Sequence, residues 1–408
     1  MFKNLSRLAL LVFSCLSLIG AARAADPDAA NWAEVEAAAR GQTVYWYAWG
    51  GGPRINAYIA WADGELQSRY GVRLEHVKVD DTGAVVNRVL AERAAGRNTG
   101  GNVDLVWING ENFAAMKQAG LLFQPGWAKA LPNWKWVDVE GKPTVENDFT
   151  IPTDGLEAPW GMAQLVFMAD FDRLKAPPRS LEALAAWIKR NPGRFTYPQP
   201  PDFTGSTFLK QALYAVAPEP DRLALPAEGA RADAAIEVLM TWLEGVHGDL
   251  WRQGRAFPKN YAALIGLLAD GEVDIAFAFN PAAASNAIAN GELPDTVRTF
   301  VFDGGTIGNT HFVAIPFNAS AKAGALVAAN FLLSPRAQAR KQDPAVWGDP
   351  TVLDMARLSA ADRGLFDALD LGAATLTPAE LGAVLPEPHP SWMVRVEEAW
   401  KIRFSGSP

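Results

Sequence analysis

Residues 43–56, which read TVYWYAWGGGPRIN, constrain the fold of this chain more than any other stretch. The first seven residues are mostly aromatic or β-branched, a composition typical of a buried strand. Gly50, Gly51 and Gly52 then interrupt the pattern, and apolar residues recur at helical spacing from Pro53 onward. A strand, a glycine turn and a helix together predict a parallel sheet whose carboxyl edge carries a ligand-contacting loop.

Two interpretations of this turn stay open at the level of sequence. In the first, the aromatic side chains belong to the core and the glycines only reverse the chain. In the second, the loop forms one wall of a ligand cleft, with contacts from Trp49, Gly50, Gly51 and Arg54, while Tyr45 and most of the strand are interior.

The first 24 residues are typical of a cleavable secretory signal peptide. Lys3 and Arg7 precede an apolar run at 8–19, and Ala22-Arg23-Ala24 supplies the small residues of a cleavage site. The run is shorter than the roughly 20 residues that span a bilayer. Cys15 is the only cysteine and fits a lipoprotein signal poorly, so the exported chain has no disulfide framework. We therefore expect a periplasmic protein.

Length and charge narrow the class of protein. Residues 25–408 exceed what one hydrophobic core usually serves, so two domains are expected. The formal net charge is −8 and there are no basic runs, which argues against nucleic acid and anionic membranes as partners. The 15 tryptophans favour stacking or cation–π contacts with an organic ligand, although large proteins also bury tryptophan in their cores.

The pattern after the first helix continues to alternate between strands and helices. Strands are expected at 72–79 and 103–108, with helices at 83–95 and 111–120, which predicts a parallel, doubly wound sheet. The ends of the first and third strands then lie at one edge of the sheet. Asn109, Glu111 and Asn112 follow the third strand there, either as ligand contacts or as turn and capping residues.

A second set of alternating elements follows from residue 159. Strands are expected at 162–169, 195–197, 275–279 and 312–316. The polar or aromatic residues that flank these strands are candidate ligand contacts: Trp160, Thr204, Gly205, Ser206, Asn280, Asn309 and His311. The hydroxyl-rich start of the helix near residue 204 suits an anionic group, but a plain N-cap explains it equally well.

Four segments carry a family resemblance. They are 103–123 (VDLVWINGENFAAMKQAGLLF), 159–178 (PWGMAQLVFMADFDRLKAPP), 271–280 (GEVDIAFAFN) and 308–336 (GNTHFVAIPFNASAKAGALVAANFLLSPR). Together they resemble the extracellular solute-binding proteins of bacterial ABC importers. Within that family they are similar to the branch with thiamine-, polyamine- and ferric-ion-binding members, which includes the YnjB-like group.

The resemblance implies a periplasmic-binding-protein fold of type II. In that α/β fold two doubly wound lobes are joined by crossing strands, here near 159–169 and 309–316, and the ligand lies in the cleft between the lobes. The implied domains are a signal peptide (1–24), a first lobe (25–158 and 317–408) and a second lobe with the crossing strands (159–316). The expected partners of this monomer are a small organic solute and a membrane permease, which recognises the form closed by a hinge motion.

The residues themselves narrow the ligand. No two tyrosines are adjacent anywhere in the chain, which disfavours the tyrosine pair that ferric-ion binders of this family use. An aromatic strand end suits sulfate poorly. Stacking on Tyr47, Trp49 or Trp160, with a carboxylate such as Glu111, suits a thiamine-like or polyamine-like cation. A phosphate-bearing solute would instead use the amides near 50–52 and 204–206.

No enzyme motif stands out, and no cofactor or metal site is predicted. None of the four histidines stands in an HxxxH pattern, and neither a GxSxG elbow nor a Walker A loop is present. Glu397 and Glu398 are neighbours, so on a helix they point apart and form no acid/base pair. A periplasmic hydrolase with scattered carboxylates stays as the alternative, together with a ligand sensor that signals to a membrane receptor.

Overall fold

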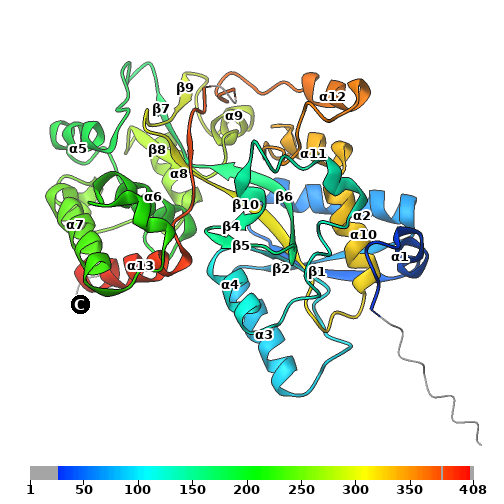
Figure 1. Ribbon diagram of the computed structural model, residues 1–408. Coiled ribbons are helices and arrows are strands. Elements are labelled where there is room, and N and C mark those ends of the chain that lie inside the picture. Colours follow the sequence, from blue (N-terminus) through cyan, green and yellow to red (C-terminus); the bar gives the residue numbers. More distant parts are fainter. Residues whose placement is uncertain (1–25, 378–379, 405–408) are drawn as a thin grey trace, which may run out of the picture.

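The computed structural model describes residues 26–377 and 380–404 (Figure 1). The predicted signal peptide and Cys15 lie outside the described residues, so the predicted cleavage stays a prediction. Among the described residues, no helix is both long and apolar enough to cross a membrane. Two sheets, each flanked by helices, lie side by side and define the two lobes used below (Figure 1).

The first lobe is built on a six-stranded sheet in the order β11-β10-β3-β1-β2, with β6 paired to β10. Its central strands β1, β2 and β3 run parallel, as the alternating sequence pattern predicted, and β10 runs antiparallel to β3. The strands are β1 (Thr43–Trp49), β2 (Arg73–Val79), β3 (Leu105–Ile108), β6 (Glu157–Gln164), β10 (Thr306–Ala314) and β11 (Val384–Leu385). A small hairpin of β4 (Asn147–Asp148) and β5 (Ile151–Pro152) lies beside this sheet.

Helices cover both faces of the first sheet. They are α1 (Trp32–Ala39), α2 (Pro53–Tyr70), α3 (Thr82–Ala94), α4 (Glu111–Gln118), α10 (Lys322–Leu332), α11 (Pro335–Gln342) and α12 (Ala360–Asp367). Local chemistry sets their ends: the side chain of Asp81 caps α3 by accepting from the amide of Gly83 at 2.9 Å. Gly71 ends α2 in the left-handed conformation that glycine adopts without strain.

The second lobe has a three-stranded sheet in the order β8-β7-β9. Its strands are β7 (Val166–Asp170), β8 (Ile275–Ala278) and β9 (Val297–Phe300). Its helices are α5 (Leu181–Arg190), α6 (Phe203–Val216), α7 (Gly229–His247), α8 (Tyr261–Ala269) and α9 (Ala283–Ala289). The strand expected at 195–197 is reduced to a single parallel bridge between Phe195 and Ile275.

The chain crosses between the lobes twice. Leu165 alone separates β6 in the first sheet from β7 in the second, and residues 301–305 separate β9 from β10. The two crossings pair with each other antiparallel, from Gln164 opposite Gly308 to Glu157 opposite Ala314. The sequence expected one strand at 162–169, but the structure divides that run between two sheets.

The last helix belongs with the second lobe. Trp392 and Trp400 of α13 (Pro390–Phe404) are buried among α6 and α7, and the Trp400 indole donates to the Tyr197 hydroxyl at 3.0 Å. The predicted boundaries placed all of residues 317–408 in the first lobe. We propose that α13 be assigned to the second lobe, because its buried indoles complete that lobe's core.

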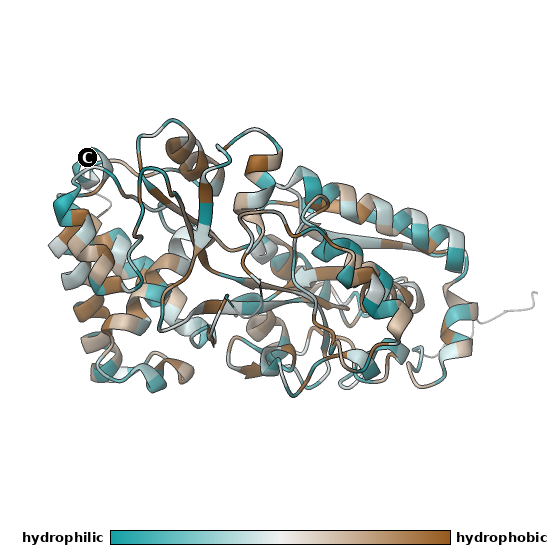
Figure 2. Ribbon diagram, turned by 90° about the horizontal axis from the view of Figure 1, so that it is seen from above, coloured by the Kyte–Doolittle hydropathy of each residue, from teal (hydrophilic) through white to brown (hydrophobic). Residues whose placement is uncertain are grey.

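Hydropathy follows the layers of the fold. Apolar residues line the strands and inner helix faces, while hydrophilic residues lie on the outer turns (Figure 2). Trp127 is buried in the first-lobe core, so the tryptophan-rich loop at 121–148 folds over that lobe. The expectation that Tyr45 is interior is wrong: its side chain is 45% exposed, because alternate residues of β1 face away from the core.

The lobes also touch through the segment after α11. The carbonyl oxygen of Trp347 accepts from Asn280 at 3.2 Å and from Asn286 at 2.9 Å, both in the second lobe. Gly348 lies directly against Ala282 and has a φ of +86°. A side chain at position 348 would overlap Ala282, so this close approach depends on glycine.

We predict that Gly348→Ala loosens the contact between the lobes. The added methyl group collides with Ala282 and strains a left-handed backbone, which should cost about 1–3 kcal/mol of stability. Thermal unfolding and small-angle scattering should show a lower melting temperature and a larger radius of gyration. Gly266→Ala in α8 is the control, since no atom lies within 4 Å of its added methyl group. Identical melting and scattering of Gly348→Ala and the parent chain would contradict the prediction.

Candidate functional site

The strand ends that the sequence singled out face the junction between the lobes. Ile108, the last residue of β3, pairs with Phe312 of the crossing strand β10. Ala278, the last residue of β8, pairs with Val166, one residue after the other crossing. The helix α4 and the β4–β5 hairpin lie on one side of the junction, and α6 and α13 lie on the other (Figure 1). Lys210 of α6 contacts the ring of Phe149 between β4 and β5. This junction is the candidate site.

A group of charged side chains occupies the junction, and we call Glu111, Asp148, Lys210, Glu387 and Glu397 the interlobe charge cluster. The ammonium of Lys210 is buried and lies 2.5 Å from Glu387 Oε2, whose carboxylate also accepts from Asn309 at 3.2 Å. The Glu397 carboxylate accepts from the Ser206 hydroxyl at 2.6 Å. Residues from both lobes therefore share one buried, predominantly acidic environment.

The carboxylates of this cluster are short of positive charge. Burial raises the pKa of Glu111, and repulsion by Glu397 and Glu387 adds to the effect, although Lys210 opposes it. Burial likewise raises the pKa of Glu397 against the opposing hydrogen bond from Ser206. Because burial disfavours the charged forms of both carboxyl groups, an incoming cation would stabilise them.

A deeper pair of carboxyl groups lies behind the cluster. Asp148 accepts from the Gly110 amide at 2.8 Å, but its other oxygen is buried without a partner. Both oxygens of Glu157 are also buried without a partner. Burial raises the pKa of both groups well above the usual range, and their mutual repulsion adds to that of Glu157. Burial therefore disfavours the charged form of both carboxyl groups.

Aromatic rings line the cluster. The Lys210 ammonium lies 4.8 Å from the ring centroid of Phe149 and 5.5 Å from that of Phe203. Phe149 stands at the tip of the β4–β5 hairpin with a φ of +55°, an uncommon backbone conformation for a bulky residue. Phe203 begins α6 and is 39% exposed. The site thus combines carboxylates with two ring faces, the groups that bind organic ammonium ions.

A second cluster lies in the first lobe where it meets the second. We call Trp107, Trp160, His311, Trp347 and the buried pair Lys341–Asp349 the aromatic cluster. The Lys341 ammonium lies 5.0 Å from the ring centroid of Trp160 and 5.4 Å from that of Trp347, and it donates to Asp349 at 2.7 Å. It also donates to the Trp160 carbonyl. The Lys341 ammonium is thus held by two ring faces, a carboxylate and a carbonyl oxygen of the chain itself.

Charge within the aromatic cluster is balanced. Burial alone would raise the pKa of Asp349, but the adjacent Lys341 ammonium and the hydrogen bond from His311 at 2.9 Å together lower it. Burial lowers the pKa of Lys341, and attraction to Asp349 opposes that shift. The Asp349 charge is therefore already compensated from within the chain.

The predicted turn after β1 lies at the edge of the junction. Trp49 is 45% exposed and its ring covers Gly51, while the Gly50 amide donates to Val79 at 3.1 Å. Arg54 donates to Asn290 of the second lobe at 2.6 Å and to the Pro344 carbonyl at 2.7 Å. The turn therefore connects the two lobes at the rim of the junction, that is, at its outer edge.

The other predicted contacts separate into two groups. Glu111, Asn112, Ser206 and Asn309 lie at the interlobe charge cluster, where Asn112 donates to Glu111 at 3.0 Å, and Asn109 stands two residues before Glu111. Trp160, Asn280 and His311 lie at the aromatic cluster. Trp160 has no exposed surface, so the expected stacking of a ligand on its ring has no support in this arrangement.

The start of α6 favours the capping interpretation over an anion site. Asp202 accepts from the amides of Thr204 and Gly205 at 3.0 and 3.2 Å. Gly205 lies so close to the Pro198 carbonyl that no group fits between them. Since these amides already have an acceptor, a phosphate would have to displace the Asp202 carboxylate.

Several residues of the site were missed by sequence reasoning. None of these residues stands in a motif, and the Lys210–Glu387 and Lys210–Phe149 contacts join residues that are distant in the chain. The missed residues are Asp148, Phe149, Lys210, Glu387, Lys341, Trp347 and Asp349. The acidic pair Glu397–Glu398 was correctly predicted to point apart, with Glu397 in the site and Glu398 exposed. The only available signal for Lys210 was that it is the single charged residue in the stretch 203–216.

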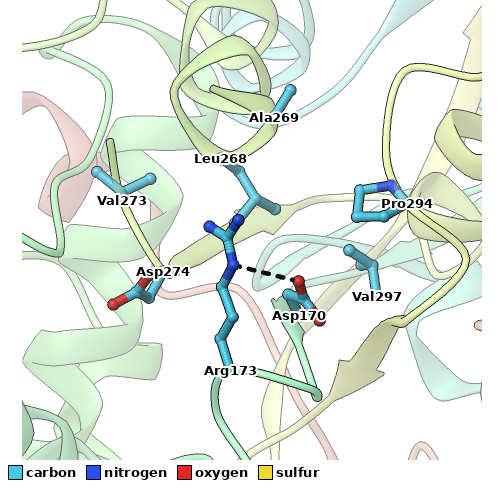
Figure 3. Close-up of a pocket in the computed structure, with 8 residues that line it drawn as sticks. All are labelled: Asp170, Arg173, Leu268, Ala269, Val273, Asp274, Pro294 and Val297. Carbon is cyan, nitrogen blue, oxygen red and sulfur yellow. Dashed lines mark ion pairs between the residues drawn. The ribbon is translucent and has the colours of Figure 1, made fainter. Parts of the chain in front are cut away.

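A small cavity elsewhere is unrelated to this junction. It measures about 30 Å³, room for about one water molecule, and lies where β7 ends and β9 begins (Figure 3). Arg173 pairs with Asp170 across it, and Asp274 lies nearby (Figure 3). These residues stand at the end of the second sheet opposite the crossings, so the cavity is not a solute site.

Comparison with known proteins gives a consistent picture. Residues 61–361 match the family described as bacterial extracellular solute-binding protein. Protein YnjB of Escherichia coli (strain K12) is 46% identical over 376 residues, which cover 92% of this chain and 94% of that protein.

Solved structures match the fold along most of the chain. The Tp0655 (TpPotD) lipoprotein of Treponema pallidum has a TM-score of 0.63 at 13% identity, covering 89% of this chain and 100% of that one. The periplasmic binding protein AfuA of Actinobacillus pleuropneumoniae, with fructose-6-phosphate bound, has a TM-score of 0.61 at 13% identity, covering 90% and 99%. Iron-bound HitA of Pseudomonas aeruginosa has a TM-score of 0.56 at 18% identity, covering 87% and 98%. The predicted periplasmic-binding-protein fold is confirmed.

We predict that Lys341→Met destabilises the chain strongly. Removing the ammonium leaves the Asp349 charge buried with only His311 beside it, which should cost about 3–5 kcal/mol. The double variant Lys341→Met/Asp349→Asn should recover most of that loss in urea unfolding. Lys129→Met is the control, because the Lys129–Glu146 pair is solvent-exposed and should contribute about 0–1 kcal/mol. A single variant as stable as the parent chain would show that the pair is not needed.

Proposed function

The chain belongs to the family of bacterial extracellular solute-binding proteins, and from this premise we propose that it carries a small cationic organic solute, thiamine-like or polyamine-like, in the junction between its lobes. It then delivers the solute to the membrane permease of an ABC importer from the periplasm. The observation that carries the proposal is the interlobe charge cluster. Its carboxylates come from both lobes, and burial raises the pKa of two of them, Glu111 and Glu397.

The geometry supports a cation over an anion. A cation entering beside Glu111 and Glu397 would relieve their repulsion, and the ring of Phe203 offers a partly exposed face for stacking or cation–π contact. An anion would instead add to the negative charge of the cluster, and the amides at the start of α6 are already capped by Asp202. The proposed contacts are therefore Glu111, Asn112, Phe149, Phe203 and Glu397, with Trp49 and Arg54 at the rim.

The structural neighbours are described with different ligands, so the proposed solute has to be argued from the side chains of this chain. One neighbour is described with fructose-6-phosphate, another with iron, and a third belongs to the PotD proteins, one of which is described as a spermidine/putrescine transporter component. Iron is disfavoured here because the sequence has no adjacent pair of tyrosines of the kind that ferric-ion binders of this family use. Tyr197, a potential ligand in the second lobe, is buried and accepts from Trp400.

The alternative functions have less support. The family match and the YnjB relative favour solute binding over hydrolysis. A sensing role for a membrane receptor would use the same closure between lobes. The two roles differ in the partner of the closed form, so a permease encoded beside this chain would favour transport.

We predict that Glu111→Gln weakens binding of a cationic solute about tenfold or more, since a charge-assisted contact is worth about 1.5–3 kcal/mol. The measurement is a thermal-shift and calorimetric screen of the mature chain against thiamine, putrescine, spermidine, choline, glucose and phosphate. A solute at about 100 times its dissociation constant should add roughly 2.7 kcal/mol of stability.

The matched control is Glu398→Gln, because Glu398 is exposed on the same helix as Glu397 and faces away from the site. Its binding should equal that of the parent chain. If phosphate or glucose binds and no cation does, the proposed ligand class is wrong. Normal cation binding by Glu111→Gln would instead move the contact away from this carboxylate.

We also predict that cation binding weakens as the pH falls from 8 to 5. The pKa values of Glu111 and Glu397 are raised, with Lys210, Glu387 and Asp148 as their charged or titratable neighbours. Below these pKa values the carboxyls are neutral and lose their attraction for a cation, so binding must release protons and strengthen with pH. Calorimetry with putrescine, whose amines stay protonated over this range, measures the slope. A Glu111→Gln/Glu397→Gln variant should show little slope, and a rise in affinity toward acid would contradict the prediction.

A further inference from the structure

Lys210 lies where the proposed solute would place a positive charge. Its ammonium is buried between the rings of Phe149 from the first lobe and Phe203 from the second, and it pairs with Glu387. The surrounding groups are those that would bind a free amine: ring faces and a carboxylate. A side chain of the protein therefore already fills one cation position within the interlobe charge cluster.

The neighbouring acidic groups outnumber this single ammonium. Glu111, Glu387 and Glu397 surround Lys210, and the charge of Lys210 acts on both Glu111 and Glu397. Asp148 and Glu157 lie deeper, where Asp148 accepts from the Gly110 amide, so they are counted apart from the three carboxylates around Lys210. Three carboxylates against one ammonium leave two negative charges without a counterion.

A further buried atom points to a missing partner at the same place. Asn309 is 3% exposed and donates to Glu387, yet its side-chain oxygen is buried without any hydrogen-bond donor. Buried polar atoms in folded proteins are nearly always paired. An ammonium N–H is a donor that would satisfy this oxygen while compensating the carboxylates.

We propose that Lys210 is a specificity-determining residue that occupies one cation position and thereby fixes the preferred solute charge at two. The inference rests on the proposed function and narrows its ligand class to organic dications such as diamines. A monocation leaves one carboxylate uncompensated, and a trication brings one positive charge too many. The Lys210–Glu387 pair thus determines how many positive charges of the solute the remaining carboxylates can compensate.

The test compares n-butylamine, putrescine and spermidine, which carry one, two and three positive charges. Affinities of the full mature chain are measured by calorimetry at pH 8 for the parent chain and for variants at positions 210 and 387. The ratio of affinities for two amines is compared between variants, because the contribution of solute length is the same in every variant and cancels in that comparison. An opposite charge within about 4–6 Å changes such an equilibrium about tenfold or more.

Lys210→Met should raise the spermidine-to-putrescine affinity ratio about tenfold, since a third negative charge becomes available. Glu387→Gln should raise the butylamine-to-putrescine ratio by a similar factor, since one negative charge is lost. Lys210→Met/Glu387→Gln removes one charge of each sign and should return both ratios to those of the parent chain. Lys210→Arg keeps the charge and should leave both ratios unchanged.

The possible outcomes separate the two proposals. If the parent chain binds none of the three amines, the proposed function fails. If it binds them and the ratios are the same in all variants, the role of Lys210 is wrong and the proposed function stands. Should Lys210→Met fail to fold because Glu387 is left buried and unpaired, Glu387→Gln and the double variant carry the same test. A folded double variant with no amine binding would also overturn the role of Lys210.

Discussion

The antiparallel pairing of β6 with β10 is the interaction on which the rest of the structure depends. Each strand leaves one sheet and continues, after a short link, into a strand of the other sheet. Because β6 and β10 are hydrogen-bonded to each other, the two links that lead to the second sheet start from one rigid ladder. This ladder limits how the two hydrophobic cores can be placed relative to each other. β10 also carries Asn309 to Glu387 and His311 to Asp349, so one strand positions a polar contact in each of the two clusters. The site therefore follows from the connection between the lobes as much as from either lobe.

Both clusters bury a lysine beside a carboxylate and two aromatic rings, but they differ in charge balance. Lys341 and Asp349 compensate each other, and the pKa of Asp349 falls below its usual range despite burial. Lys210 instead shares a space with more carboxylates than it can compensate, and the pKa of Glu111 rises. Burying a balanced pair is a structural solution that needs nothing from outside. Burying an unbalanced group is favourable when a ligand supplies the missing charge. This difference distinguishes the interlobe charge cluster, the proposed binding site, from the aromatic cluster.

The sequence predicted the fold well because hydrophobic periodicity and turn residues are local signals. β1, α2, α3 and the parallel order of the first sheet all follow from such signals. The candidate site could be predicted only in part: Glu111 and Ser206 were proposed as contacts because they follow strand ends or open helices, and both lie in the interlobe charge cluster. Lys210 and Glu387 were not, since their pairing joins residues 177 positions apart. Tyr45 was wrongly placed inside, because the strand presents alternate residues to solvent and its composition does not reveal that face.

Under the proposed function, the position of the interlobe charge cluster would link the charge of the solute to closure of the lobes. Glu111 and Phe149 belong to the first lobe, whereas Lys210 and Glu397 belong to the second, so the complete cluster exists only when the lobes are together. Without a solute, closure brings carboxylates of like charge toward one another and is opposed by their repulsion. A cation of the right charge reverses the sign of that effect. Since a ligand shifts a conformational equilibrium only by its differential affinity for the two states, a solute that neutralises carboxylates from both lobes favours closure far more than one that reaches a single lobe. The same carboxylates would then select the solute and report its presence to the permease.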